Sequence, residues 1–134
     1  MKFALDFDKT FPHPIERAWH ALTDRAALAQ WLMDTDFVPE AGREFSLWCP
    51  GGDGGTDHYR CEVLELDPPR RMVWSWVLEG RESEGATRVE FSLEPVPGGT
   101  RLRLRHSGDR DPQTIEAFRH GWPEKLRALE QTLA

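Results

Sequence analysis

Histidine is the residue type in this sequence best suited to acid–base or metal chemistry, because its ring titrates near neutral pH. The chain has five, at His13, His20, His58, His106 and His120. No pair has the HExxH spacing of a zinc site, and no acidic residue stands at a fixed ligand offset from them. The sequence therefore predicts no metal and no cofactor. His106 alone falls on the inward face of a predicted strand, where a hydrogen-bonded core residue is expected more often than a catalyst.

The remaining candidates for chemistry are two cysteines, a pair of acids and a glycine-rich stretch. Cys49 and Cys61 lack CxxC spacing. A disulfide between them is conceivable, but two free thiols are expected in a reducing cytosol. Asp34 and Asp36 are expected to cap a helix-to-strand turn rather than to work as an acid–base pair. Residues 50–57, PGGDGGTD, lack the pattern of a phosphate loop, and the chain has no GxSxG elbow, so a mobile hairpin tip is expected there.

Tryptophans form the second conspicuous set of residues. In MVWSWVL, Trp74 and Trp76 share one face of a strand, ~6.6 Å apart. Trp31 and Trp122 fall on inward faces of predicted helices. Four converging indoles either overfill a small core or line a hollow, and both interpretations stay open. A hollow of this kind suits binding a flat or lipid-like molecule better than breaking one. The predicted ligand-binding residues are Trp31, Met33, Trp48, Tyr59, Trp74, Trp76, His106, Phe118 and Trp122.

Length and charge limit the classes of function that the chain can have. Its 134 residues suit one domain, residues 1–134, that can bury a hydrophobic core without needing disulfides or a structural metal. The net charge of −6 argues against nucleic acid and anionic membranes as partners, because both need concentrated Lys and Arg. No apolar run approaches the ~20 residues of a membrane span, and the N-terminus lacks a signal stretch. A cytoplasmic location is expected.

The elements that position these side chains begin with a strand and two short helices. Alternation in residues 2–11 predicts the strand. Residues 14–22 predict a helix that starts at its proline, with apolar residues at i, i+3, i+4 and i+7. Residues 23–32 predict a second helix, capped by Thr23 or Asp24.

From residue 36 on, alternation of period two predicts about six further antiparallel strands. A bulge is expected near Leu64, and the turn DPPRR ends that strand because two prolines cannot continue a ladder. The strands at 87–95 and 100–106 form the clearest hairpin. Their outer faces carry acids opposite arginines, which predicts a solvated face with cross-strand ion pairs rather than a phosphate site.

The C-terminal segment predicts one long helix, with Asp111 as its N-cap and Pro112 as its first residue. Pro123 predicts a kink near residues 119–123, but the apolar stripe keeps its phase across it. That stripe consists of Ile115, Phe118, Trp122, Leu126, Leu129 and Leu133. Only this helix is large enough to cover an apolar sheet face. The predicted fold is α+β, with a bent antiparallel sheet of about seven strands wrapped around the C-terminal helix and two short helices between strands one and two.

Four stretches in the same order resemble one known family over nearly the whole chain. They are IERAWHALTDRAALAQWL, DPPRRMVWSW, VPGGTRLRLRHSG, and HGW followed by leucines. The sequence resembles the activator of heat-shock protein 90 ATPase homologue-like family, within the START and birch-pollen-allergen (SRPBCC) superfamily. The resemblance implies the helix-grip fold with a cavity between sheet and long helix. It carries no catalytic motif, and the additional N-terminal domain of the family's co-chaperone is not expected here.

Three functions remain open. The leading hypothesis is non-catalytic binding of a small hydrophobic molecule in that cavity. The second is an enzyme of aromatase/cyclase or hydrolase type, an activity that the superfamily resemblance suggests, with His106 and Tyr59 as acid–base groups. The third is a protein-interaction module with a chaperone partner. The oligomeric state is left open as monomer or homodimer.

Overall fold

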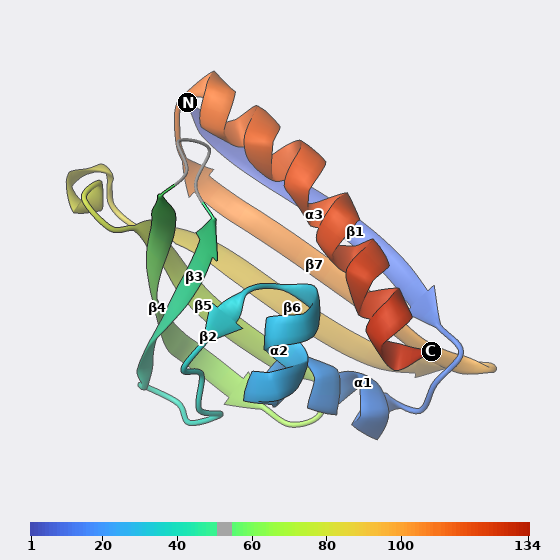
Figure 1. Cartoon of the computed structure of the whole chain (residues 1–134). Coiled ribbons are helices and arrows are strands. Elements are labelled where there is room, and N and C mark those ends of the chain that lie inside the picture. Colours follow the sequence, from blue (N-terminus) through green and yellow to red (C-terminus); the bar gives the residue numbers. More distant parts are fainter. Residues whose placement is uncertain (51–54) are drawn as a thin grey trace.

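The computed structural model describes residues 1–50 and 55–134; residues 51–54, part of the expected hairpin tip, lie outside the described residues. A seven-stranded sheet curves around one long C-terminal helix, and two short helices follow the first strand (Figure 1). The α+β helix-grip architecture predicted from the sequence is confirmed. The elements in chain order are β1 (Lys2–Phe11), α1 (Ile15–Thr23), α2 (Arg25–Trp31), β2 (Asp34–Thr35), β3 (Glu44–Pro50), β4 (Thr56–Asp67), β5 (Arg71–Leu78), the 3-10 turn η1 (Glu82–Glu84), β6 (Thr87–Val96), β7 (Gly99–Asp109) and α3 (Pro112–Leu133).

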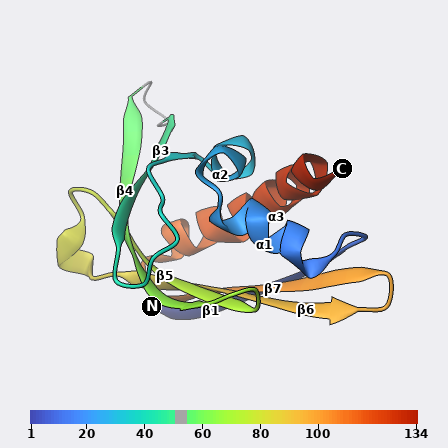
Figure 2. The same ribbon diagram turned by 90° about the horizontal axis from the view of Figure 1, so that it is seen from below.

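The sheet is antiparallel throughout, in the order β1-β7-β6-β5-β4-β3-β2. The first strand therefore lies beside the last, and the other strands follow in reverse chain order. Figure 2 shows β3 and β4 rising out of the layer that β1, β7 and β6 form. The register between β4 and β5 shifts between Val63 and Glu65, so the bulge predicted near Leu64 is confirmed. A bulge increases local twist, which helps β4 to bend toward the helices.

The two short helices are separated by a single residue, Asp24, which is the C-cap of α1 and the N-cap of α2. Its carboxylate accepts a hydrogen bond from the backbone N–H of Ala27 at 2.9 Å, as an N-cap does. Pro14 has φ of −66° and ψ of 156°, an extended backbone, and α1 begins at Ile15. The sequence prediction that the proline is the first helical residue is therefore wrong by one position, because the ring fixes φ but leaves ψ free.

Helix α3 is continuous over 22 residues although Pro123 stands in its interior. Asp111 caps it by accepting a hydrogen bond from the N–H of Thr114 at 3.0 Å, and Pro112 follows as the first residue, as predicted. In Figure 1 the helix runs alongside β1 and β7, over the concave side of the sheet. Its apolar stripe faces the sheet, and the buried members are Ile115, Trp122, Leu126, Leu129 and Leu133.

The core between sheet and helices centres on Trp74, which is fully buried. Its ring meets Phe45 at 5.0 Å and Phe91 at 4.8 Å between centroids, both edge to face. Phe37, from the segment after β2, lies 5.6 Å from the same indole. Edge-to-face aromatic pairs add to the stability that burial provides. This cluster fixes β3, β5 and β6 against one another.

The outer face of the sheet carries ion pairs across the strands, as the alternation predicts. Glu94 on β6 lies 3.5 Å from Arg101 and 4.0 Å from Arg103, both on β7. Glu90 accepts a hydrogen bond from Arg71 at 2.9 Å. Such exposed pairs contribute little to stability, because solvent screens them.

The smaller sequence predictions have separate outcomes. Cys49 and Cys61 carry free thiols, as predicted. The carboxylate of Asp36, directly after β2, accepts a hydrogen bond from the N–H of Ser46 on β3 at 2.7 Å and so links these two segments. Within residues 1–50 and 55–134, no three or more His, Cys, Asp or Glu gather as a metal site would need. No helix in this described part is long and apolar enough to cross a membrane.

Two glycines provide a test of the backbone packing. A methyl group on Gly99 would lie 1.9 Å from the carbonyl oxygen of Phe11, whereas nothing stands within 4 Å of one on Gly121. Gly99→Ala should lower the free energy of unfolding by about 1–3 kcal/mol, because backbone must move. Gly121→Ala should raise it by roughly 0.5–1 kcal/mol, because alanine favours the helix. Urea unfolding measures both, and equal midpoints would contradict the close approach at Gly99.

Candidate functional site

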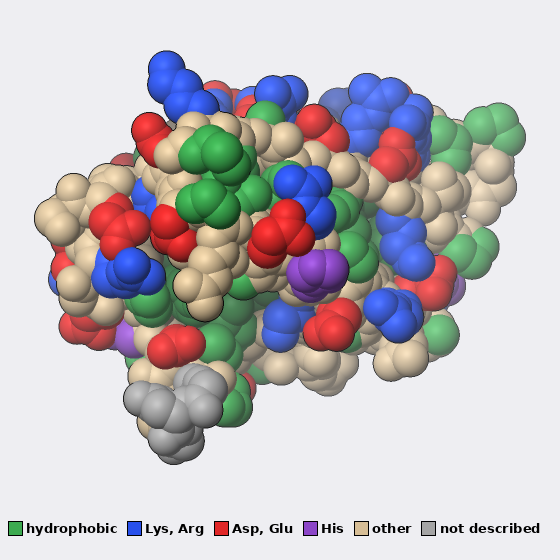
Figure 3. Space-filling model, turned by 90° about the horizontal axis from the view of Figure 1, so that it is seen from above, with side chains coloured by type: hydrophobic (Ala, Val, Ile, Leu, Met, Phe, Trp, Pro, Cys, Tyr) green, Lys and Arg blue, Asp and Glu red, His purple; other side chains and the backbone are tan. Residues whose placement is uncertain are grey.

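A cleft lies between helix α3 and strands β4 and β5. It consists of an inner hollow of about 220 Å³ and an outer hollow of about 370 Å³. The two adjoin, because Tyr59, Trp76, Ala117 and Phe118 line both. Figure 3 shows hydrophobic side chains recessed between charged ones on this side of the molecule. We call the two hollows together the α3 cleft.

The inner hollow is lined mainly by apolar side chains from the segment after α2, from β3, β4 and β5, and from α3. The rings of Tyr59 and Trp76 lie 4.9 Å apart between centroids, and those of Trp76 and Trp122 lie 5.7 Å apart. Leu32 and Met33, after α2, close one side. The structure thus brings together one part of the predicted ligand-binding set: Met33, Tyr59, Trp76, Phe118 and Trp122.

Three polar side chains border this apolar space. Burial raises the pKa of Tyr59 to about 12, so its hydroxyl stays protonated, and it has no hydrogen-bond partner within the described part of the chain. The ammonium of Lys125 donates to the carbonyl of Leu32 at 2.8 Å and has two further donors. Burial, and then the charge of Asp57, raises the pKa of the Cys49 thiol, with Lys125 opposing. A protonated thiol is a poor nucleophile.

A chain of hydrogen bonds ties the helix to the sheet behind the aromatic wall. The indole N–H of Trp122 donates to Nδ1 of His106 at 3.0 Å. Because an indole can only donate, Nδ1 is the acceptor and the ring proton sits on Nε2. Nε2 then donates to Oγ1 of Thr87 at 2.8 Å, and Thr87 donates to the carbonyl of Trp76 at 3.1 Å. Every member of this chain has its partner, and His106, one of the predicted ligand-binding residues, lines neither hollow.

The surroundings of His106 keep its ring neutral. Burial first, and the positive charge of Arg110 second, lower the pKa of His106 to about 3. At neutral pH the only ring proton is the one on Nε2, which is donated to Thr87, and the lone pair of Nδ1 is already occupied by the indole N–H of Trp122. The arrangement therefore gives His106 no acid–base role in the cleft.

The two tryptophans of MVWSWVL have different surroundings although they share a strand face. Trp74 lies in the closed core and lines neither hollow, whereas Trp76 borders both. The indole N–H groups of both are buried with no hydrogen-bond partner among the residues described. Such a donor costs roughly 1–3 kcal/mol. One tryptophan is therefore core and the other is a cavity wall.

Two more of the predicted residues lie away from the cleft. Trp31 is buried under α1, where its indole N–H donates to the carbonyl of Ala21 at 2.8 Å. Trp48 is 37% exposed and stacks on His58, with ring centroids 5.5 Å apart. It shares the outer face of β3 with Ser46, because Leu47 between them points to the core.

Sequence reasoning missed several residues that line the cleft. Gly121 and Lys125 follow Phe118 at helical steps of three and four, so the face that presents Phe118 presents them too. That spacing was a signal in the sequence. The sequence carried no such signal for the polar rim of the outer hollow. The rim combines residues of the η1 segment with residues at the start of α3, and only the fold brings these two segments together. The rim includes Arg81, Glu84, Arg110, Asp111, Gln113 and Thr114.

The neutrality of His106 predicts a pH dependence of stability. Below its ordinary pKa of 6.5 the unfolded chain binds a proton there, while the folded chain does not until about pH 3. The unfolded state holds more protons in that window, so stability falls as pH falls, by up to ~1.4 kcal/mol per pH unit. His106→Gln should remove this component. Urea unfolding between about pH 6 and pH 4 compares the two slopes, and equal slopes would refute a buried neutral ring.

Solved structures of several bacterial proteins share this fold. A protein from Mesorhizobium loti is 32% identical, with a TM-score of 0.86, covering 98% of this chain and 96% of that chain. CalU16 from Micromonospora echinospora is 25% identical, with a TM-score of 0.81, covering 99% and 77%. A protein from Chromobacterium violaceum reaches a TM-score of 0.87 at 21% identity, covering 97% and 96%, and at that identity the likeness shows the fold alone. No curated protein matches the chain.

The family assignment rests on sequence as well as on fold. The model of the family described as Activator of Hsp90 ATPase homolog 1-like protein matches residues 12–134. This range contains the stretches that suggested the resemblance, and it includes every residue of the α3 cleft. The chain belongs to the Activator of Hsp90 ATPase homolog 1-like protein family.

Proposed function

We propose that the protein binds a small hydrophobic molecule, aromatic or lipid-like, in the α3 cleft and performs no chemistry on it there. The observation that carries this proposal is the inner hollow. This hollow is open to solvent, so a small molecule can reach the apolar side chains that line it. Here the rings of Trp76, Trp122 and Phe118 border about 220 Å³ of unfilled space. Concave apolar sites with few polar groups are typical of small-molecule binding.

The polar groups of the cleft suggest the chemistry of the ligand. The hydroxyl of Tyr59 stays protonated and can donate a hydrogen bond. The ammonium of Lys125 stands at the edge of the same hollow with two donors to spare. Donors therefore outnumber acceptors around the apolar space. A flat or elongated hydrophobic molecule with one carbonyl, hydroxyl or carboxylate group fits this arrangement best.

The titratable groups near the cleft support binding rather than catalysis. His106 is neutral, and both of its ring nitrogens are engaged in hydrogen bonds. The thiol of Cys49 has a raised pKa, so little thiolate is present at neutral pH. Neither group offers the activated nucleophile or the free base that acyl or cyclisation chemistry needs.

A ligand screen tests the proposal directly. Fatty acids, sterols, flavonoids and polycyclic aromatics are screened by thermal shift and by tryptophan fluorescence, which Trp76 and Trp122 should report. A ligand at ~100 times its dissociation constant should stabilise the fold by ~2.7 kcal/mol. For a domain of this length the melting temperature should rise by very roughly 8 °C. If no compound moves the midpoint, the interaction-module hypothesis becomes the better one.

Gly121 allows the cleft to be filled without disturbing its walls. A Cβ there meets nothing within 4 Å and the residue lines the inner hollow, so Gly121→Leu should occupy the space that a ligand needs. We expect folding to be retained and ligand affinity to fall at least tenfold. Gly121→Ala is the matched control, and it should keep most of the affinity. Unchanged affinity in Gly121→Leu would locate the ligand elsewhere.

A further inference from the structure

A serine, a histidine and a glutamate form a hydrogen-bonded chain on the outer face of the sheet, away from the α3 cleft. Oγ of Ser46 on β3 lies 2.8 Å from Nε2 of His58 on β4. Nδ1 of the same ring is hydrogen-bonded to the carboxylate of Glu79, directly after β5. The backbone N–H of Glu79 also donates to the carbonyl of His58 at 2.8 Å, which holds the carboxylate beside the ring.

The direction of these hydrogen bonds follows from the chemistry of the groups. An ionised carboxylate only accepts, so Nδ1 of His58 carries the proton that it shares with Glu79. The lone pair of Nε2 is then free to accept the hydroxyl proton of Ser46. This is the tautomer in which a histidine can take a proton from a serine, with a carboxylate to orient the ring and stabilise its cationic form.

The ring of His58 is held but reachable. Trp48 stacks on one face, with an interplanar angle of 18°. The side chain of His58 is 26% exposed, and that of Glu79 is 52% exposed. A substrate can therefore approach from solvent, while stacking and two hydrogen bonds limit rotation of the imidazole. Both conditions are needed for a working base.

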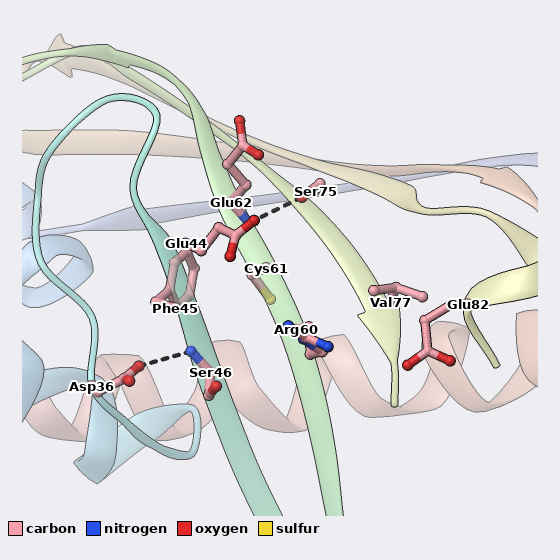
Figure 4. Close-up of a pocket in the computed structure, with 10 residues that line it drawn as sticks. All are labelled: Asp36, Glu44, Phe45, Ser46, Arg60, Cys61, Glu62, Ser75, Val77 and Glu82. Carbon is pink, nitrogen blue, oxygen red and sulfur yellow. Dashed lines mark hydrogen bonds between the residues drawn. The ribbon is translucent and has the colours of Figure 1, made fainter. Parts of the chain in front are cut away.

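A hollow of about 450 Å³ opens beside Ser46 on this outer face (Figure 4). Arg60 lies opposite Ser46 in the β3–β4 register and forms no salt bridge with another residue of the described chain. Its guanidinium is thus available to stabilise an oxyanion that forms at Ser46. The acids of the hollow, Asp36, Glu44, Glu62 and Glu82, outnumber this one cation, so the hollow disfavours anionic substrates.

We propose that Ser46, His58 and Glu79 form a hydrolytic site for neutral or cationic carboxylic esters, independent of ligand binding in the α3 cleft. Oγ of Ser46 attacks the ester carbonyl carbon, and its proton passes to Nε2 of His58. The bond between that carbon and the alcohol oxygen breaks, and the alcohol leaves with the proton. Water then attacks the acyl-serine, giving one proton to His58. The acid leaves as Ser46 regains that proton.

The reactivity of Ser46 separates this proposal from a purely structural role, in which the three residues only link β3, β4 and the end of β5. An uncharged alkyl fluorophosphonate should form a covalent adduct on the peptide that contains Ser46, as identified by mass spectrometry. His58→Gln should lower the rate of labelling at least tenfold, and Ser46→Ala should abolish it. Ser92→Ala removes an outer-face serine on β6 that bonds only Arg71, and it should label as the wild type does.

Ester hydrolysis provides the second measurement. The wild-type chain should hydrolyse neutral p-nitrophenyl acetate and cationic acetylthiocholine, and it should be at least tenfold slower with an ester that carries a carboxylate on its acyl group. Ser46→Ala and Glu79→Gln should each lose at least tenfold in rate, with circular dichroism confirming that they fold. An unlabelled Ser46 in the folded wild type, or hydrolysis that survives in folded Ser46→Ala, overturns the proposal.

Discussion

The hydrogen bond from the indole of Trp122 to His106 is the contact on which the arrangement of helix and sheet depends. An indole can only donate, so this one bond sets the tautomer of the histidine and, through it, the direction of the bonds to Thr87 and to the carbonyl of Trp76. Four elements, α3, β7, β6 and β5, are thereby joined through polar atoms that are all satisfied. A buried network of this kind holds one geometry, because any displacement leaves a polar group unpaired at a cost of roughly 1–3 kcal/mol. The helix is held above the sheet at a fixed position, and space remains beside it.

His106 and His58 illustrate how surroundings assign different roles to one residue type. Trp122 occupies Nδ1 of His106, and burial keeps that ring neutral, so it links the helix to the sheet. At His58 a carboxylate occupies Nδ1 instead, which leaves Nε2 as the acceptor of a serine hydroxyl near solvent. The curved sheet separates the two environments, with the apolar cleft on its concave side and the polar hollow on its outer side. Membership of the family fixes the sheet and helix that both sites share, whereas each proposed activity depends on a few side chains placed on that frame.

Most of the fold could be predicted from the sequence, because secondary structure and its caps depend on residues that are close together in the chain. A strand repeats every two residues and a helix every 3.6, so the order of elements and the inward faces followed from apolar spacing. Caps are equally local, which is why Asp111 was identified as an N-cap and Asp24 was one of two candidates for the other. The bulge near Leu64 appeared as a break in alternation. The inward direction of Trp76, Trp122 and His106 also came from this spacing alone.

The depth at which each side chain is buried, and the register between strands, were decided by the tertiary structure. Parity places Trp74 and Trp76 on one face, but only the curvature of the sheet and the position of α3 leave one in closed core and the other beside a hollow. The approach of Ser46, His58 and Glu79 required the register of β3 on β4 and of β4 on β5, which pairs residues far apart in the chain. A sequence fixes which way each side chain points along its own strand or helix, because that depends on neighbouring dihedral angles. It does not fix how far away the facing surface lies, because that distance results from the packing of the whole domain.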